Sequence, residues 1–220
     1  MTESDPLETA LRATALRLTP PLPELGDAAA AAGLLDVAYA GLDSPVGRLL
    51  LAATPAGLVR IAYLDGNQTQ ETILAEVAAL VSPRMLAAPR RLDRPRRELE
   101  EYFHGRRRRF ELELDWRLLS AFGQRVLRAT AAIPYGSVST YKQVAAEAGS
   151  PRGFRAAGNA LGANPLPIVL PCHRVLHSGG GLGGYTGGLQ RKRVLLGLEA
   201  GQLPLDAPNA TLADTGVGRF

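Results

Sequence analysis

Cysteine is nearly absent from this chain: its 220 residues include one, Cys172. A single cysteine cannot form an internal disulfide or supply a zinc site built from several thiolates. The chain also lacks any run of about 20 consecutive apolar residues, the length that crosses a bilayer. The N-terminus has no basic segment followed by an apolar core, which a secretory signal requires. We therefore expect a cytoplasmic protein with no metal, no cofactor and no membrane contact.

A large excess of charge of either sign is missing too. The 25 basic and 21 acidic residues give a formal charge of +4, which does not by itself imply a nucleic-acid partner. Arginine is clustered at Arg90–Arg91, Arg96–Arg97 and Arg106–Arg109, and a solvated face explains each cluster equally well. The richness in Ala, Arg, Gly and Pro, with few Lys, suggests a GC-rich bacterial genome and leaves the function open.

The distribution of residue types divides the chain into an N-terminal extension, two domains and a C-terminal tail, over residues 1–36, 37–117, 118–202 and 203–220. The extension is interrupted by Pro20–Pro23, and a short amphipathic helix is predicted near Leu7–Leu18. No internal repeat is present.

The first domain has the pattern of a small α/β unit with an antiparallel sheet. Turn signals at Ser44–Gly47 and Ala56-Gly57 separate two apolar segments, which predicts a β-hairpin. Helical periodicity and one alternating segment follow. The predicted elements are strands Leu49–Ala53, Leu58–Leu64 and Phe110–Leu114, and helices Thr69–Val81 and Arg94–Phe103.

The second domain is mainly helical, which makes the fold class α+β. Two short helices joined by a tight turn predict a helix-turn-helix. The three prolines of Asn164–Val175 favour extended backbone, and glycines make Ser178–Gly188 a loop. The predicted helices are Ser120–Ile133, Thr140–Ala148, Arg152–Leu161 and Gln190–Leu198, with Ser150-Pro151 as the start signal of the third.

The lone cysteine lies in the segment Pro171-Cys172-His173-Arg174, behind a short apolar run. Thiol chemistry needs a thiolate, and an unperturbed thiol with a pKa near ~8.5 is mostly protonated at neutral pH. A neighbouring base raises the thiolate fraction, so the adjacent histidine indicates a reactive thiol. The competing interpretation is an inert, buried cysteine that packs as a small hydrophobe.

Further motifs surround this segment in a fixed order. They are Ile133-Pro134-Tyr135-Gly136, Ser139–Ala145, Arg155–Leu161, Asn164-Pro165, Ile168–His177, Gly183–Leu189, Lys192, Leu195-Leu196 and Glu199. From Phe122 to Glu199 the ordered set closely resembles the O6-alkylguanine-DNA alkyltransferases, also called methylated-DNA–protein-cysteine methyltransferases. A weaker resemblance continues back to Leu42 and implies a ribonuclease-like fold for the first domain.

The resemblance implies direct reversal of DNA damage. In such a protein, an alkyl group moves irreversibly and once from O6-alkylguanine to Cys172, after the nucleotide is flipped out of the duplex through the minor groove. The expected partner is double-stranded DNA containing alkylated guanine. The protein is expected to be a monomer acting at the nucleoid, with cooperative binding and repair of O4-alkylthymine left open.

The resemblance also assigns site residues. Cys172 is the nucleophile, His173 activates it through a bound water, and Glu199 orients and charges the histidine. Asn164 braces this network and Tyr141 supplies the proton that the leaving guanine needs. The residues expected around the alkylguanine are Val175, Tyr185, Thr186, Gly187 and Lys192. Thr186 departs from the family's usual serine, and Leu127 stands where members often have tryptophan.

The second helix of the helix-turn-helix is nearly bare, because its middle is Ala156-Ala157-Gly158-Asn159-Ala160. A major-groove reader needs long polar side chains, whereas small residues permit close backbone approach to the minor groove. Packing of the small face against another helix is the alternative. By resemblance, Arg155 fills the space left by the flipped base. The residues expected to contact DNA are Tyr141, Lys142, Ser150, Arg155, Ala156, Gly158 and Ser178.

Two other functions remain open. An alkyltransferase-like protein binds lesions without catalysis and lacks the reactive cysteine, so Cys172 is the discriminating residue. A cysteine hydrolase or redox enzyme would turn over repeatedly, and the lack of a second cysteine counts against the redox version. His104 and His177 are taken as ordinary surface or loop residues, and a solvated helix-end glutamate is the alternative for Glu199.

Overall fold

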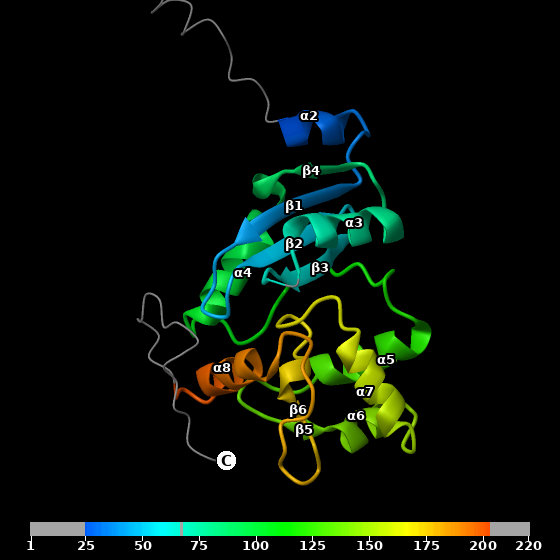
Figure 1. The fold of residues 1–220 in the computed structure, drawn as a ribbon, viewed down its shortest axis with the longest axis vertical. Coiled ribbons are helices and arrows are strands. Elements are labelled where there is room, and N and C mark those ends of the chain that lie inside the picture. The colour runs from blue at the N-terminus through cyan, green and yellow to red at the C-terminus, as the bar shows by residue number, and fades with distance from the viewer. Residues whose placement is uncertain (1–24, 67, 203–220) are drawn as a thin grey trace, which may run out of the picture.

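The computed structural model describes residues 25–66 and 68–202. The helix predicted near Leu7–Leu18 and the C-terminal tail lie outside these residues. The described chain consists of a sheet with flanking helices and, beneath it, a group of helices joined by loops (Figure 1). This arrangement confirms the predicted α+β class. Within the described ranges, no helix is both long and apolar enough to cross a membrane.

A four-stranded sheet organises the first part of the chain, in the order β3-β2-β1-β4. Strands β1 (Val37–Leu42), β2 (Leu49–Thr54) and β3 (Gly57–Tyr63) are antiparallel neighbours, which confirms the predicted hairpin. Strand β4 (Met85–Ala87) adds to β1 in parallel and was not predicted. Three residues are too few to show a period in the sequence.

The sheet is covered on both faces, by α3 (Gln70–Leu80) and α4 (Asp93–Phe103). Successive residues of β2 alternate between the two faces, so Leu50 packs in a cluster with the α3 residues while Leu51 packs in a cluster with the α4 residues. Burial on both faces explains why β2 is a continuous apolar run. The cluster on the α4 face continues into the core of the helical part and joins the two parts of the molecule.

The described end of the N-terminal extension includes helix α2 (Leu25–Ala31). It lies beside the β4 edge of the sheet (Figure 1), where a Cβ on Gly26 would come within 2.6 Å of the Ala88 side chain. Arg84 donates to both carboxylate oxygens of Asp36, at 2.8 and 2.6 Å, and to the carbonyl of Gly33 at 3.1 Å. These contacts fix the chain between α2 and the sheet.

The strand predicted at Phe110–Leu114 is wrong. Leu114 makes one isolated bridge with Leu58, and the rest of the segment forms no ladder. The α4 side chains explain this, because the Glu98 carboxylate accepts the Glu111 amide at 2.8 Å and Arg94 donates to the Glu111 carbonyl. Both backbone groups of Glu111 are therefore unavailable for pairing with β3.

Four helices form most of the second part: α5 (Ala121–Ala131), α6 (Tyr141–Glu147), α7 (Phe154–Gly162) and α8 (Leu189–Glu199). Ser120 caps α5, and Thr140 with Gln143 forms a capping box on α6, as the sequence pattern favours. Helices α6 and α7 pack together as the predicted helix-turn-helix. Helix α7 starts after Gly153 rather than after Ser150-Pro151, because a turn closed by Gly153 N–H and Ser150 C=O comes first.

The extended backbone predicted for Asn164–Val175 is also wrong. The segment folds as successive turns, with a hydrogen bond from Leu170 N–H to Leu166 C=O at 2.9 Å and a 3₁₀ turn over Cys172–Arg174. Its apolar side chains point into the core, which outweighs the extended preference of the prolines. Ile168 has φ 75°, a left-handed conformation that a β-branched residue adopts only when its surroundings impose it. The turn preceding Cys172 is therefore rigidly specified.

Candidate active site and nucleic-acid interface

A cleft of about 510 Å³ lies between the helix-turn-helix and the glycine-rich loop 178–188. Cys172 forms part of its wall, although the residue is only 5% exposed. The cleft is lined by Tyr141, Phe154, Arg155, Gly158, Leu161, Gly162, Cys172, His177, Gly184, Tyr185 and Thr186. The fold thus brings the single thiol to the same cavity as residues of α6 and α7.

Asn164 fixes the position of the thiol. Its side-chain amide donates to Cys172 Sγ at 3.1 Å and to the Leu170 carbonyl at 2.8 Å, while its carbonyl oxygen accepts the Leu166 amide at 3.0 Å. Burial raises the pKa of Cys172 to about 11, although the Asn164 bond and the nearby positive charge of Lys192 oppose the rise. The resting group is therefore a thiol, and a base must remove its proton before it can attack.

His173 is the base nearest in the chain, and its tautomer follows from its partner. Nε2 lies 2.8 Å from Glu199 Oε1, and because an ionised carboxylate only accepts, Nε2 carries the proton. Nδ1 is buried with no hydrogen-bond partner among the described residues. Burial lowers the pKa of His173 despite the carboxylate beside it. A neutral imidazole with a free Nδ1 lone pair is able to accept a proton.

Glu199 is the centre of a buried polar network. It accepts hydrogen bonds from the Tyr102 hydroxyl at 2.7 Å, from Arg174 Nε and Nη2 at 2.8 and 2.9 Å, and from Gly136 N–H at 3.2 Å. Burial alone would raise the pKa of Glu199, but the bonds from His173 and Arg174 outweigh it and lower the pKa to about 2. Glu199 is therefore not the solvated helix-end residue of the alternative interpretation.

Arg174 and His173 share the Glu199 carboxylate. Burial is the main reason that the pKa of His173 is lowered, and the positive charges of Arg174 and Lys192 add to this lowering. The 2.8 Å contact from His173 Nε2 to Glu199 supports the expected role of Glu199 in orienting the ring, and its role in charging the histidine stays a prediction. Sequence reasoning missed both Arg174 and Tyr102. Their contacts with Glu199 join residues 25 and 97 positions apart, which no local pattern reveals.

Three residues expected around the alkylguanine lie behind the cleft rather than in its wall. Lys192 is buried beneath the glycine-rich loop, where Nζ donates to the carbonyls of Val175 at 2.6 Å, Gly184 at 3.4 Å and Leu182. Burial lowers the pKa of Lys192 to about 8. Val175 is fully buried, and Gly187 packs against the Tyr63 ring. Val175 and Lys192 lie beneath the loop, and Gly187, which is part of the loop, is turned toward Tyr63.

Tyr141, at the start of α6, contacts the glycine-rich loop across the cleft. The Tyr141 hydroxyl donates to the Gly184 carbonyl at 3.4 Å, and its ring lies 5.1 Å from the His177 ring. His177 also lines the cleft, although no motif in the sequence distinguishes it from an ordinary loop residue. Thr186 lines it as expected, and its hydroxyl donates to the Gly162 carbonyl at 2.9 Å. That bond ties the loop to the end of α7.

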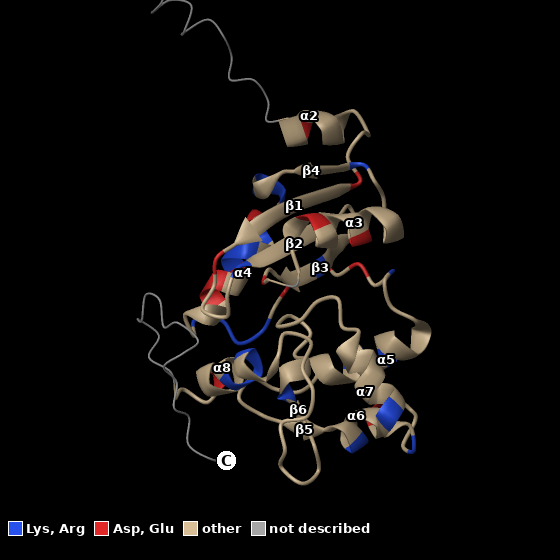
Figure 2. Ribbon diagram, viewed as in Figure 1, with Lys and Arg blue, Asp and Glu red and all other residues tan. Residues whose placement is uncertain are grey.

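Helix α7 presents its small residues to two environments. Ala157 is buried against the neighbouring helices, whereas Arg155 and Ala156 are exposed and Gly158 lines the cleft. The buried side of the helix thus confirms packing of small residues against other helices, whereas approach of its exposed side to the minor groove stays a prediction. Basic residues lie on α6, on α7 and on the turn between them (Figure 2).

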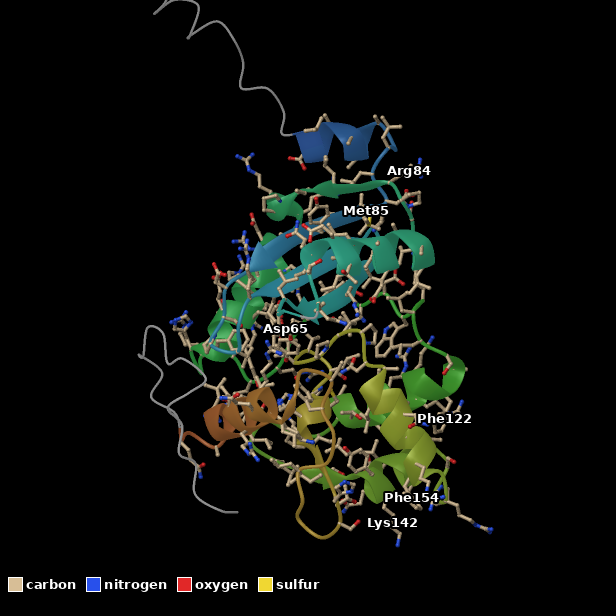
Figure 3. The ribbon with its side chains drawn as sticks, in the orientation of Figure 1. Asp65, Arg84, Met85, Phe122, Lys142 and Phe154 are labelled. Atoms are coloured by element: carbon tan, nitrogen blue, oxygen red, sulfur yellow. The ribbon has the colours of Figure 1, made fainter. Side chains whose placement is uncertain are left out.

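The remaining residues expected to contact DNA surround this helix pair. Lys142 and Phe154 point outward at the end of the molecule remote from the sheet (Figure 3). Ser150 is half-buried in the turn, and Ser178 is exposed in the loop. None of Lys142, Ser150 and Ser178 lines the cleft. Among the described residues, no group of three or more His, Cys, Asp or Glu is placed to hold a metal ion.

Two domain models of one known family match most of this chain. The 6-O-methylguanine DNA methyltransferase ribonuclease-like domain matches residues 37–116, and the DNA binding domain of the same family matches residues 121–201. A methylated-DNA–protein-cysteine methyltransferase of Mycolicibacterium paratuberculosis is 40% identical over 168 residues, or 76% of this chain and 95% of that protein. The chain belongs to the 6-O-methylguanine DNA methyltransferase family.

Other 6-O-methylguanine DNA methyltransferases are similar over most of their length. A methylated-DNA–protein-cysteine methyltransferase of Rattus norvegicus is 35% identical over 173 residues, covering 69% of this chain and 76% of that protein. The crystal structure of Mycobacterium tuberculosis OGT in complex with DNA matches with a TM-score of 0.65 and 36% identity, over 77% of this chain and 96% of that one. Membership of the family makes this chain a DNA-binding enzyme of alkyl-damage repair.

Proposed function

We propose that the chain repairs O6-alkylguanine in double-stranded DNA by moving the alkyl group to Cys172, once per molecule. The position of Cys172 is the observation that supports this proposal most strongly. Its sulfur is held by Asn164 in the wall of a cleft, beside His173 and below the helix-turn-helix. The expected form is a monomer in the bacterial cytoplasm, where the single thiol stays reduced.

The proposed reaction is an in-line displacement. His173 Nδ1 takes the thiol proton through an intervening water, and the sulfur attacks the alkyl carbon as the bond from that carbon to guanine O6 breaks. The guanine receives a proton from the Tyr141 hydroxyl, the tyrosine regains one from solvent in the cleft, and His173 releases the thiol proton to solvent. In the net change the thiol proton moves to guanine and the alkyl group to sulfur. The thioether is stable, so the protein is consumed.

Access to the lesion requires that the nucleotide leaves the duplex. Extrusion costs a few kcal/mol, roughly, in lost stacking and pairing. Arg155 lies at the start of α7 and lines the cleft, which supports its role in filling the vacated space. A planar guanidinium can stack on bases and donate hydrogen bonds at once. The bare face of α7 favours approach from the minor groove.

The placement of Cys172 favours this function over non-catalytic lesion binding. A protein that only binds the flipped base has no use for a thiol held by Asn164 beside a proton acceptor. Repeated thiol–disulfide chemistry is disfavoured because the sequence holds no second cysteine.

A titration with radiolabelled DNA tests the proposal. A duplex carrying O6-methylguanine is supplied in large excess, and methyl transferred to protein is counted over time. We expect a plateau at one methyl group per chain, and none with Cys172→Ala, which should still bind the duplex. Continued release of methyl groups beyond that plateau would contradict single turnover.

A further inference from the structure

One wall of the cleft is held from the sheet domain. Tyr185 lines the cleft, with its ring edge-on to His173 at 6.4 Å. Its hydroxyl lies 2.7 Å from the hydroxyl of Tyr63, the last residue of β3, and either group can donate. Among the described residues the Tyr185 hydroxyl makes no other hydrogen bond. A residue 122 positions away thus supplies the hydrogen bond that holds the Tyr185 hydroxyl.

Tyr63 is itself rigidly placed. The Arg191 guanidinium lies over its ring at 4.6 Å and donates to the carbonyls of Val46 at 2.8 Å and Gly187 at 3.0 Å. The Gly187 backbone also packs against the ring, since a Cβ there would come within 2.5 Å of it. Arg191 therefore joins the sheet domain to the glycine-rich loop, and both Arg191 and Gly187 contact the ring of Tyr63.

We propose that Tyr63 is a positioning residue for the base-binding cleft: its hydroxyl fixes Tyr185 and so sets the width available to the alkylated base. The inference rests on the proposed function, because it names what holds the proposed base site in shape. Without the tether, the Tyr185 ring is free to turn about its side-chain bonds. A small base then loses a fixed wall, whereas a bulkier base can displace the ring and keep its contacts.

The test removes a single oxygen with Tyr63→Phe, which leaves the packing of the ring intact. Binding of free O6-methylguanine and O6-benzylguanine is measured by calorimetry on the Cys172→Ser protein, so that transfer is not needed. The loss of one net hydrogen bond corresponds to a rise of about fivefold in the dissociation constant of O6-methylguanine. For O6-benzylguanine we expect a change of less than about twofold, because the larger group replaces the lost restraint.

A double-mutant cycle shows whether the two hydroxyls act as one unit. Tyr185→Phe should weaken O6-methylguanine binding as much as Tyr63→Phe, and the double variant should bind no worse than either. Tyr39→Phe is the matched control, because Tyr39 is half-buried against the opposite face of the sheet. It should bind both bases as the parent does.

A second assay uses protein that retains Cys172 and measures the rate at which iodoacetamide alkylates this thiol. It distinguishes a positioning role of Tyr63 from a general loosening of the fold. The rate should stay within about twofold of the parent in Tyr63→Phe, because the hydrogen bond from Asn164 to the sulfur is untouched. Unchanged O6-methylguanine binding, additive losses in the double variant, or a rise in iodoacetamide rate that parallels the binding loss would each overturn the inference. Failure of the parent protein to accept a methyl group from DNA would instead refute the proposed function, while the binding test would still decide the role of Tyr63.

Discussion

Replacing Glu199 with glutamine removes one charge from the centre of the buried network and keeps its shape. The carboxylate accepts from Arg174 at 2.8 and 2.9 Å, and the two side chains are 7% and 1% exposed. The amide of glutamine cannot neutralise the arginine. Breaking a buried ion pair by removing one partner typically costs about 3–5 kcal/mol, because the remaining charge is left without compensation.

The pH dependence of stability gives a second value for the free energy that the Glu199 carboxylate contributes to folding. The pKa of Glu199 is lowered from 4.5 to about 2 in the folded chain, so its contribution is full above pH 4.5 and is lost as the pH falls through about 2. The difference corresponds to about 3 kcal/mol, which agrees with the cost of the broken pair. The glutamine side chain that replaces Glu199 has no proton to gain between pH 5 and pH 2. The free energies of unfolding of parent and variant should therefore converge as the pH falls through this range.

Thermal and urea unfolding of Glu199→Gln measure this cost. For a chain of this size, 3–5 kcal/mol lowers the melting temperature by roughly 6–20 °C at neutral pH. Glu100→Gln, an exposed glutamate on α4, is the control and should change stability by less than about 0.5 kcal/mol. A Glu199→Gln protein as stable as the parent at pH 7, or a difference that persists unchanged at pH 2, would refute the reasoning.

Three further predictions concern DNA and the thiol. Arg155→Ala should slow transfer from duplex DNA about tenfold or more while leaving transfer from a free alkylguanine base within about twofold, because it acts on the flipped state. Arg152→Ala, an exposed neighbour outside the cleft, is the control, and equal losses on both substrates would assign Arg155 to the pocket. Gly158→Phe should weaken duplex binding in a filter assay, since a Cβ there meets only Tyr141 at 3.7 Å and the added ring would project into the cleft; normal binding would exclude α7 as the docking surface. The iodoacetamide rate of Cys172 should rise about tenfold per pH unit from pH 7 to 9.5, because burial raises its pKa to about 11, and a plateau below pH 9 would contradict the buried thiol.

Local patterns accounted for most of the fold. Turn residues and apolar segments located β2 and β3, and helical periodicity located α3 and α4. The failures share a cause, which is that distant side chains decide the local backbone. Glu98 and Arg94 remove Phe110–Leu114 from the sheet, and the core imposes a left-handed Ile168 on a proline-rich turn.

The site shows the same limit. Cys172 and His173 are neighbours in sequence, and the family resemblance supplied Glu199 and Asn164. Arg174, which is adjacent to His173, was overlooked because an arginine's partner is not visible in its own segment. Tyr102, Tyr63 and His177 carried no local signal at all. They reach the site because the sheet domain and the loop 178–188 pack against it.

The central claim is that the alkyl group ends on one sulfur. Its most direct test is mass spectrometry of the chain after incubation with duplex DNA containing O6-methylguanine, first intact and then after proteolysis. The account predicts the mass of one added methyl group, located on the peptide that contains Cys172, with the DNA restored to guanine. Demethylated DNA with an unmodified chain, or a methyl group on any other residue, would contradict it.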